Sequence, residues 1–100
     1  MEKDLDNLFK SNTIVYTIRW NPTKSARLKR VRGVSFEEII QAQFLGFRDS
    51  HNRENQQLML FEYRNYIWLV PFVRKGNEIF LKTLYPSRKY TKIYKKGEQK

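Results

Sequence analysis

The first regular pattern along the chain is a run of alternating apolar and polar residues at positions 13–20. This period of two predicts a strand with one buried face. Three more strands are predicted at residues 57–63, 66–74 and 78–85, and the links between these three are short enough for antiparallel hairpins. Pro71 cannot donate to a strand ladder, so we expect a bulge or an unpaired position there. The apolar residues of the first strand share one side: Ile14, Tyr16, Ile18 and Trp20.

Two helices are predicted between the first strand and the other three. The first covers residues 22–32, with Asn21 as its N-cap and Pro22 as its first residue. Proline favours that position because the N–H that it lacks would have no partner there. Gly33 then breaks the chain.

The second helix is predicted to begin after Ser35. Ser35 and Glu38 have the spacing of a capping box, in which each side chain accepts a hydrogen bond from the other residue's backbone. We expect this helix to end at Gly46, as a C-terminal cap, and residues 47–55 to form a polar loop with at most a short strand at its start. Its apolar stripe follows helical spacing: Phe36, Ile39, Ile40 and Phe44.

A last helix is predicted from Ser87, its cap, to Lys96. The order of elements is then β-α-α-β-β-β-α. This order predicts an α+β fold in which a helical pair packs on a small antiparallel sheet, followed by a basic C-terminal helix. Residues 1–100 are interpreted as a single domain, with residues 1–11 and 97–100 as loose ends.

The composition excludes several chemistries. The sequence has no cysteine, which excludes disulfides, zinc–thiolate sites and cysteine catalysis. With a single histidine, His51, and no glycine-rich phosphate motif, we expect no metal and no cofactor. The apolar runs are too short to cross a membrane, and the acidic first residues are unlike a signal peptide, so we expect a cytoplasmic protein and no membrane partner.

Charge is the strongest compositional feature, with 20 Lys and Arg against 10 Asp and Glu, a net charge of +10. Residues 19–32 contain no acid, and residues 82–100 contain one, Glu98. The like charges within each cluster repel one another unless phosphates neutralise them, which favours a nucleic-acid partner. The alternative is a pair of ordinary solvated helix faces.

Tyr90 and Tyr94 lie four residues apart on the predicted last helix, among the cations of the second cluster. Their simplest role is to pack that helix on the sheet, together with Ile93. A tyrosine in such a basic setting can also stack on an unpaired base or donate its phenol to a phosphate.

Several of these landmarks together resemble the BrnT-type toxins. The segment from Trp20 to Lys24 resembles the family's W-D-x-x-K, and Gly33 follows Lys24 at the family's distance and begins the G-V-S-F-E-E block. Asp49, His51 and Glu54 resemble its D-x-x-H…E loop in a shortened form, and residues 87–91, S-R-K-Y-T, resemble the S-A-R-K-A-T before its last helix. The likeness covers residues 16–96. Val31-Arg32 stands where the family has Lys-His.

The resemblance implies a RelE-like fold and a toxin that blocks translation by cutting RNA, as an endoribonuclease of the mRNA interferase kind. It implies a ribbon-helix-helix antitoxin as partner, ribosome-bound mRNA as a substrate, and operator DNA bound only through the antitoxin. Two alternatives are a non-catalytic nucleic-acid-binding domain and a toxin of the same fold that acts on a protein such as gyrase.

The arginine and tyrosine arrangement of RelE-type toxins implies a catalytic set of Arg88, Tyr94 and Arg74. Arg88 would stabilise the pentavalent phosphate, Tyr94 would donate a proton, and Arg74 with Lys89 would hold the substrate. The remaining candidates for RNA binding are basic residues of the two clusters: Lys24, Arg27, Arg30, Arg32 and Lys92.

Overall fold

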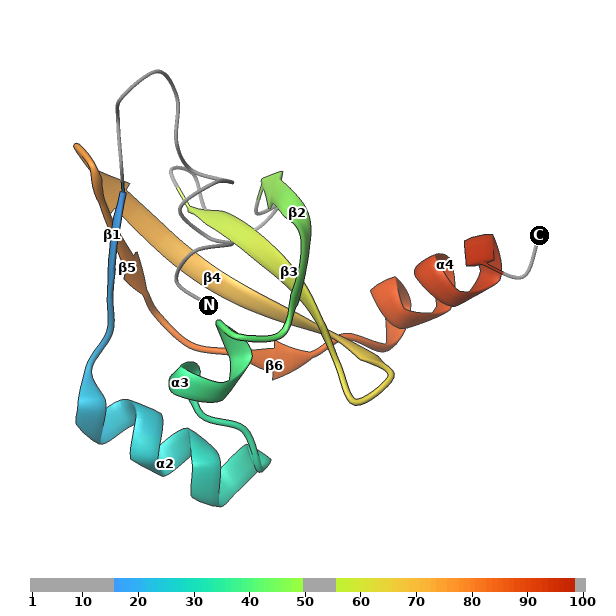
Figure 1. Cartoon of the computed structure of the whole chain (residues 1–100), viewed down its shortest axis with the longest axis horizontal. Helices are drawn as coiled ribbons and strands as arrows, with labels where there is room; N and C mark the ends of the chain where they lie inside the picture. The colour runs from blue at the N-terminus through green and yellow to red at the C-terminus, as the bar shows by residue number, and fades with distance from the viewer. Residues whose placement is uncertain (1–15, 50–55, 99–100) are drawn as a thin grey trace.

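The structure, a computed structural model, describes residues 16–49 and 56–98, and the strands of these residues form one six-stranded sheet (Figure 1). The strand order is β1-β5-β4-β3-β2, with β6 also paired to β4. Neighbouring strands are antiparallel except for β1, which runs parallel to β5. The strands are β1 Thr17–Arg19, β2 Gln43–Asp49, β3 Gln57–Tyr63, β4 Tyr66–Lys75, β5 Glu78–Leu81 and β6 Tyr85–Pro86.

The α+β class is therefore observed, but the predicted antiparallel sheet is wrong, because the sheet is mixed. The short β1 belongs to no hairpin, and alternation of side chains does not reveal the direction in which a strand pairs. The predicted order also lacked a strand between the second helix and β3, and treated β5 and β6 as one strand. At the break between these two, Lys82 N–H donates to Pro71 O over 2.9 Å, while on the other side Pro71 keeps its register with Leu58 of β3.

Three helices accompany the sheet in the described residues: α2 Pro22–Arg32, α3 Phe36–Ile39 and α4 Arg88–Glu98. The predicted caps of α2 are confirmed, since Asn21 Oδ1 accepts from two backbone N–H groups and Gly33 adopts a left-handed φ of 82°. The capping box of Ser35 and Glu38 is also confirmed. No described helix has the length and apolar character to span a bilayer.

The second helix is much shorter than predicted. It ends at Ile39, and Phe44 lies in β2, with its ring edge-on to Phe61 of β3 at 5.4 Å between centroids. Gly46 is not a helix cap but part of a bulge in β2, with a φ of 145° that favours glycine. Phe44 satisfies a helical stripe and a strand equally well, and pairing with β3 decides between them.

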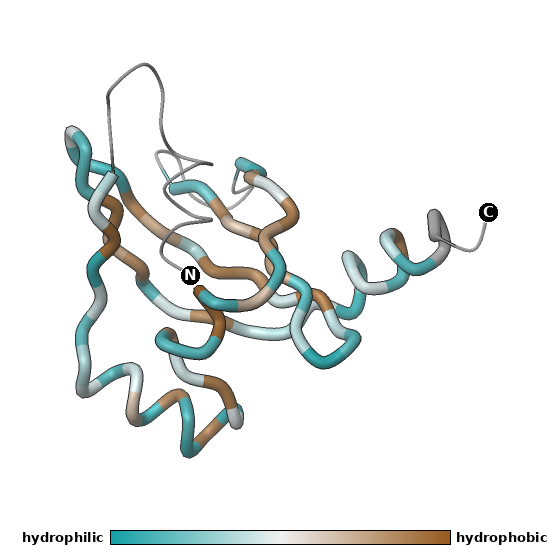
Figure 2. Tube along the Cα trace, in the orientation of Figure 1, coloured by the Kyte–Doolittle hydropathy of each residue, from teal (hydrophilic) through white to brown (hydrophobic). Residues whose placement is uncertain are grey.

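The sheet buries apolar side chains on both faces, which we call the α2 face and the α4 face. Along β3, Met59 and Phe61 point to the α2 face, where they join Leu28 of α2 and Phe36 of α3. Figure 2 shows hydrophobic positions gathered along the central strands, whereas the helices carry many hydrophilic ones. Two tyrosines of α4 pack against the α4 face. The alternate residues of β3 and β4 that form this face are Leu58, Leu60, Ile67 and Leu69.

Candidate nucleic-acid interface

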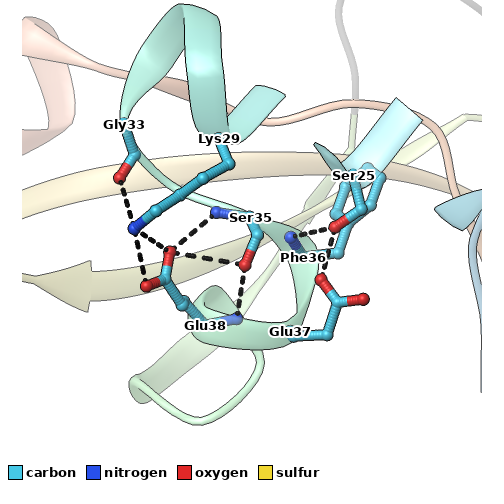
Figure 3. A network of polar contacts seen from close by, with 7 residues as sticks. All are labelled: Ser25, Lys29, Gly33, Ser35, Phe36, Glu37 and Glu38. Carbon is cyan, nitrogen blue, oxygen red and sulfur yellow. Dashed lines mark hydrogen bonds and ion pairs between the residues drawn. The ribbon is translucent and has the colours of Figure 1, made fainter. Parts of the chain in front are cut away.

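A polar network attaches α2 to α3 (Figure 3). Ser25, only 1% exposed, accepts a hydrogen bond from the backbone N–H of Phe36 and donates one to the carboxylate of Glu37. Glu37 also accepts from the indole N–H of Trp20 at 3.2 Å. The Ser25 hydroxyl in particular holds the pKa of Glu37 below its ordinary value, although partial burial works in the other direction. This network orients α2 with one narrow face inward.

Ion pairs neutralise only some of the cations near α2. Lys29 Nζ lies 2.8 Å from Glu38 Oε2, and this contact lowers the pKa of Glu38 (Figure 3). Arg19 pairs with Glu78 at 3.3 Å. In residues 16–49 and 56–98 these are the ion pairs within 4 Å, so no carboxylate of the described residues lies at that distance from the cations of α2 other than Lys29.

Three cations of α2 border a small cleft, which we call the α2 cleft. Its lining comes from α2 and from Thr83, which lies in the link between β5 and β6. The cleft has a volume of about 120 Å³ and is partly open to solvent. Of the four predicted RNA-binding residues on α2, three line it and Arg30 does not. The lining residues are Lys24, Arg27, Leu28, Val31, Arg32 and Thr83.

The second basic cluster lies on α4, which is held to the sheet through Thr91. Its Oγ1 accepts from Ile67 N–H at 2.9 Å and donates to Ser87 O at 2.6 Å. The predicted cap is confirmed, since Ser87 Oγ accepts from Tyr90 N–H. Tyr90 and Tyr94 pack against the α4 face of the sheet. The cations at the start of the helix are all exposed: Arg88, Lys89 and Lys92.

A contact between Arg48 and Tyr94 joins α4 to the edge strand β2. Arg48 Nη2 donates to the phenol oxygen of Tyr94 at 3.0 Å, while Nη1 donates to Phe47 O at 2.7 Å. Because Arg48 occupies a lone pair of that oxygen, the phenol proton is free to point toward a further acceptor. Sequence reasoning missed Arg48, which it placed in a loop. No local pattern marks it, because the residues that follow Phe47 are polar and only the pairing with β3 continues the strand to Asp49.

The structure does not bring the three predicted catalytic residues together. Arg74 Nη1 donates to the phenol of Tyr16 at 3.1 Å. Arg74 also pairs in register with Ile79, whose side chain is on the α2 face, so the Arg74 side chain lies on the face opposite α4. Arg88 and Tyr94 lie on one helix but about 120° apart around its axis and roughly 9 Å apart along it. In the described residues it is Arg48 that contacts Tyr94.

Other predicted features fall outside this interface. His51 and Glu54 lie outside the described residues, as does Ile14 in the predicted first strand. Asp49, the remaining member of the same motif, is the last residue of β2 and pairs with Gln57. Residues 16–49 and 56–98 contain no group of three or more His, Cys, Asp or Glu side chains suited to hold a metal ion.

Comparison with known proteins adds one similar structure. No protein-family model matches the sequence, and no curated protein sequence matches it. The crystal structure of the Brucella abortus ribonuclease toxin BrnT is similar to this chain, with a TM-score of 0.49 and 15% sequence identity. The match covers 73% of this chain and 97% of that one.

Proposed function

We propose that this chain is the toxin of a toxin–antitoxin pair, with a RelE-like topology, and that it stops translation by cutting RNA. The observation that carries the proposal is the Arg48–Tyr94 contact, a guanidinium against a phenol beside a helix of exposed cations. The resemblance of the G-V-S-F-E-E and S-R-K-x-T segments to BrnT-type toxins supports it, as do the uncompensated cations of α2.

The reaction that suits these groups is internal attack by the RNA itself. The 2′-oxygen of one nucleotide attacks the neighbouring phosphorus, and its proton passes to water. The bond from phosphorus to the 5′-oxygen of the next nucleotide breaks, and that oxygen takes the phenol proton of Tyr94, which water then restores. The products are a 2′,3′-cyclic phosphate and a free 5′-hydroxyl. A guanidinium can neutralise the pentavalent phosphate, so this route requires no metal ion.

Within this mechanism Arg48 has two tasks. It holds the phenol oxygen of Tyr94, which directs the phenol proton outward, and its fork of N–H donors suits the oxygens of the reacting phosphate. Arg88, Lys89 and Lys92 would hold phosphates on either side of the reacting one. Arg74, on the other face of the sheet, would contact only a distant part of the strand.

The partners proposed are ribosome-bound mRNA and a ribbon-helix-helix antitoxin. An antitoxin that covers Tyr94 and the cations of α4 would stop cleavage, and the complex would bind operator DNA through the antitoxin. A buried area of about 1,600 Å² or more is typical of such a stable interface.

Purified protein incubated with RNA, with and without ribosomes, tests the proposal. We expect fragments that end in a 2′,3′-cyclic phosphate, and we expect Tyr94→Phe to retain RNA binding while losing about a hundredfold in single-turnover rate, as for a lost general acid. Tyr90→Phe, one helical turn away, is the matched control and should cut normally. Soluble wild-type protein that shifts RNA in a gel but never cuts it would instead establish a binding domain.

A further inference from the structure

We infer that the α2 cleft binds one unpaired nucleotide of an RNA strand, with its phosphate on Lys24 and Arg27 and its base or ribose against Leu28 and Val31. The inference rests on the proposed function and extends it, because it assigns a place to the part of the strand outside the reacting bond. It also separates the cations of α2 into those that contact RNA and those that serve the fold.

The arrangement of the cations is the first argument. Lys24, Arg27 and Val31 follow one another at helical spacing, so they lie along one side of α2 at the cleft. No acidic residue lines the cleft, whereas Lys29, on another side of the same helix, is paired with Glu38. Positive groups gathered at one concave surface repel one another until an anion binds, and phosphate binding also releases counterions.

The apolar part of the lining is the second argument. Two apolar residues line the cleft: Leu28 is 6% exposed, whereas Val31 is 67% exposed. A site for phosphate alone has no use for an exposed apolar side chain. An unpaired nucleotide offers both a charged phosphate and an apolar ring face, and proteins commonly recognise single-stranded RNA by covering such faces. A duplex hides those faces, so the cleft favours a single strand.

The position of Thr83 is the third argument. Thr83 is the lining residue of the cleft that does not come from α2, and Arg88 begins α4 five residues later, after β6. Five residues span at most about 18 Å, which limits the distance between the cleft wall and α4. Figure 1 draws β6 between the α2–α3 pair and α4. One strand of RNA can therefore pass along β6 and contact both basic helices, although they cover opposite faces of the sheet.

The test measures binding without cleavage, using a single-stranded oligonucleotide whose 2′-hydroxyls are methylated so that it cannot be cut. Fluorescence anisotropy with the full chain should show about tenfold weaker binding for Arg27→Ala, a loss of the size expected for one charged hydrogen bond. The matched control is Arg30→Ala, which removes the same charge from the same helix outside the cleft and should change binding less than about twofold. The slope of log affinity against log salt should become shallower by about 0.7 for each phosphate that the cleft variant no longer neutralises.

A second pair of variants lies outside α2 and does not depend on the stability of that helix. Thr83→Glu places a carboxylate in the cleft, and Asn77→Glu makes the same change of charge in the exposed turn between β4 and β5. We expect Thr83→Glu to weaken binding about tenfold and Asn77→Glu to have little effect. We also expect Val31→Ser to weaken binding of this oligonucleotide, and we expect no such loss for an oligonucleotide that lacks its bases.

The outcomes separate the two proposals. Equal losses of RNA affinity for the cleft variants and their controls would overturn the inference that the α2 cleft binds a nucleotide, and so would a preference for duplex over single-stranded RNA. Neither result would contradict the toxin proposal. Wild-type protein that binds neither this oligonucleotide nor cleavable RNA would overturn both.

Discussion

The two basic helices α2 and α4 have the same length of 11 residues, but they are attached to the sheet in different ways. In α2 the buried residues are Ser25 and Leu28, and a polar network also attaches this helix to α3. In α4 two tyrosines cover one face of the sheet, and its first cations are exposed. Arg27 and Arg32 of α2 are exposed like the first cations of α4, but the narrow inward face of α2 leaves them beside Thr83, with which they line the α2 cleft.

The largest effect on stability should come from the inward face of α2. Leu28→Ala removes a nearly fully buried side chain from the core and should lower the free energy of unfolding by about 2–5 kcal/mol. Ile93→Ala on α4 is the comparison, because Ile93 is 52% exposed and its loss should cost less than about 0.5 kcal/mol. Chemical denaturation of both variants measures the difference, and similar losses would contradict this account of how the two helices are attached.

The next effect concerns which arginine contacts the reacting phosphate beside Tyr94. If Arg48 contacts the reacting phosphate, Arg48→Lys should lower the single-turnover cleavage rate by about a hundredfold, since lysine lacks the planar fork of donors. Arg88→Lys should cost about tenfold or less, because Arg88 lies on another side of α4. The two rates, measured on the same RNA, decide between the residues. A larger loss for Arg88→Lys would return the central role to the residue that the sequence resemblance implies.

A smaller effect is expected from the polar contact that holds α2. Ser25→Ala leaves the Phe36 N–H without its side-chain acceptor and should destabilise the protein by about 1–3 kcal/mol. Thr91→Ala does the same to the Ile67 N–H beneath α4 and should cost a similar amount. Hydrogen exchange can locate each loss. Ser25→Ala should increase exchange in α2 and α3, and Thr91→Ala in α4, whereas uniform changes would contradict two separate attachments.

The smallest effect should be a dependence on acidity confined to the α2 side. The pKa values of Glu37 and Glu38 are both lowered, so the stabilisation that they contribute is present above about pH 4.5 and is lost as the pH falls below that value. The α2–α3 pair should therefore loosen in acid before α4 does. Glu37→Gln should reduce this dependence, as followed by amide chemical shifts. An unchanged acid transition in that variant would show that Glu37 does not contribute.

Local signals predicted the elements that depend on neighbouring residues. Asn21, Pro22 and Gly33 mark the ends of α2, the capping box marks the start of α3, and the strand predicted at residues 57–63 is β3 with its observed bounds. The basic clusters also follow from the sequence alone, because charge is a property of the residues present. The helix caps need only a few consecutive residues to form their hydrogen bonds.

Tertiary structure decided the features that join distant segments. Phe44 lies in a strand rather than a helix because β3 supplies a partner for it, and β1 runs parallel because it pairs with β5, about 60 residues away. The Arg48–Tyr94 contact spans 46 residues, and Thr83 reaches the α2 cleft from another element. The sequence by itself determined which residues are charged, where α2 and α3 begin and which residues can face the core. Only the packed sheet decided which cations share a cleft and which arginine meets Tyr94, because those distances depend on how the strands pair.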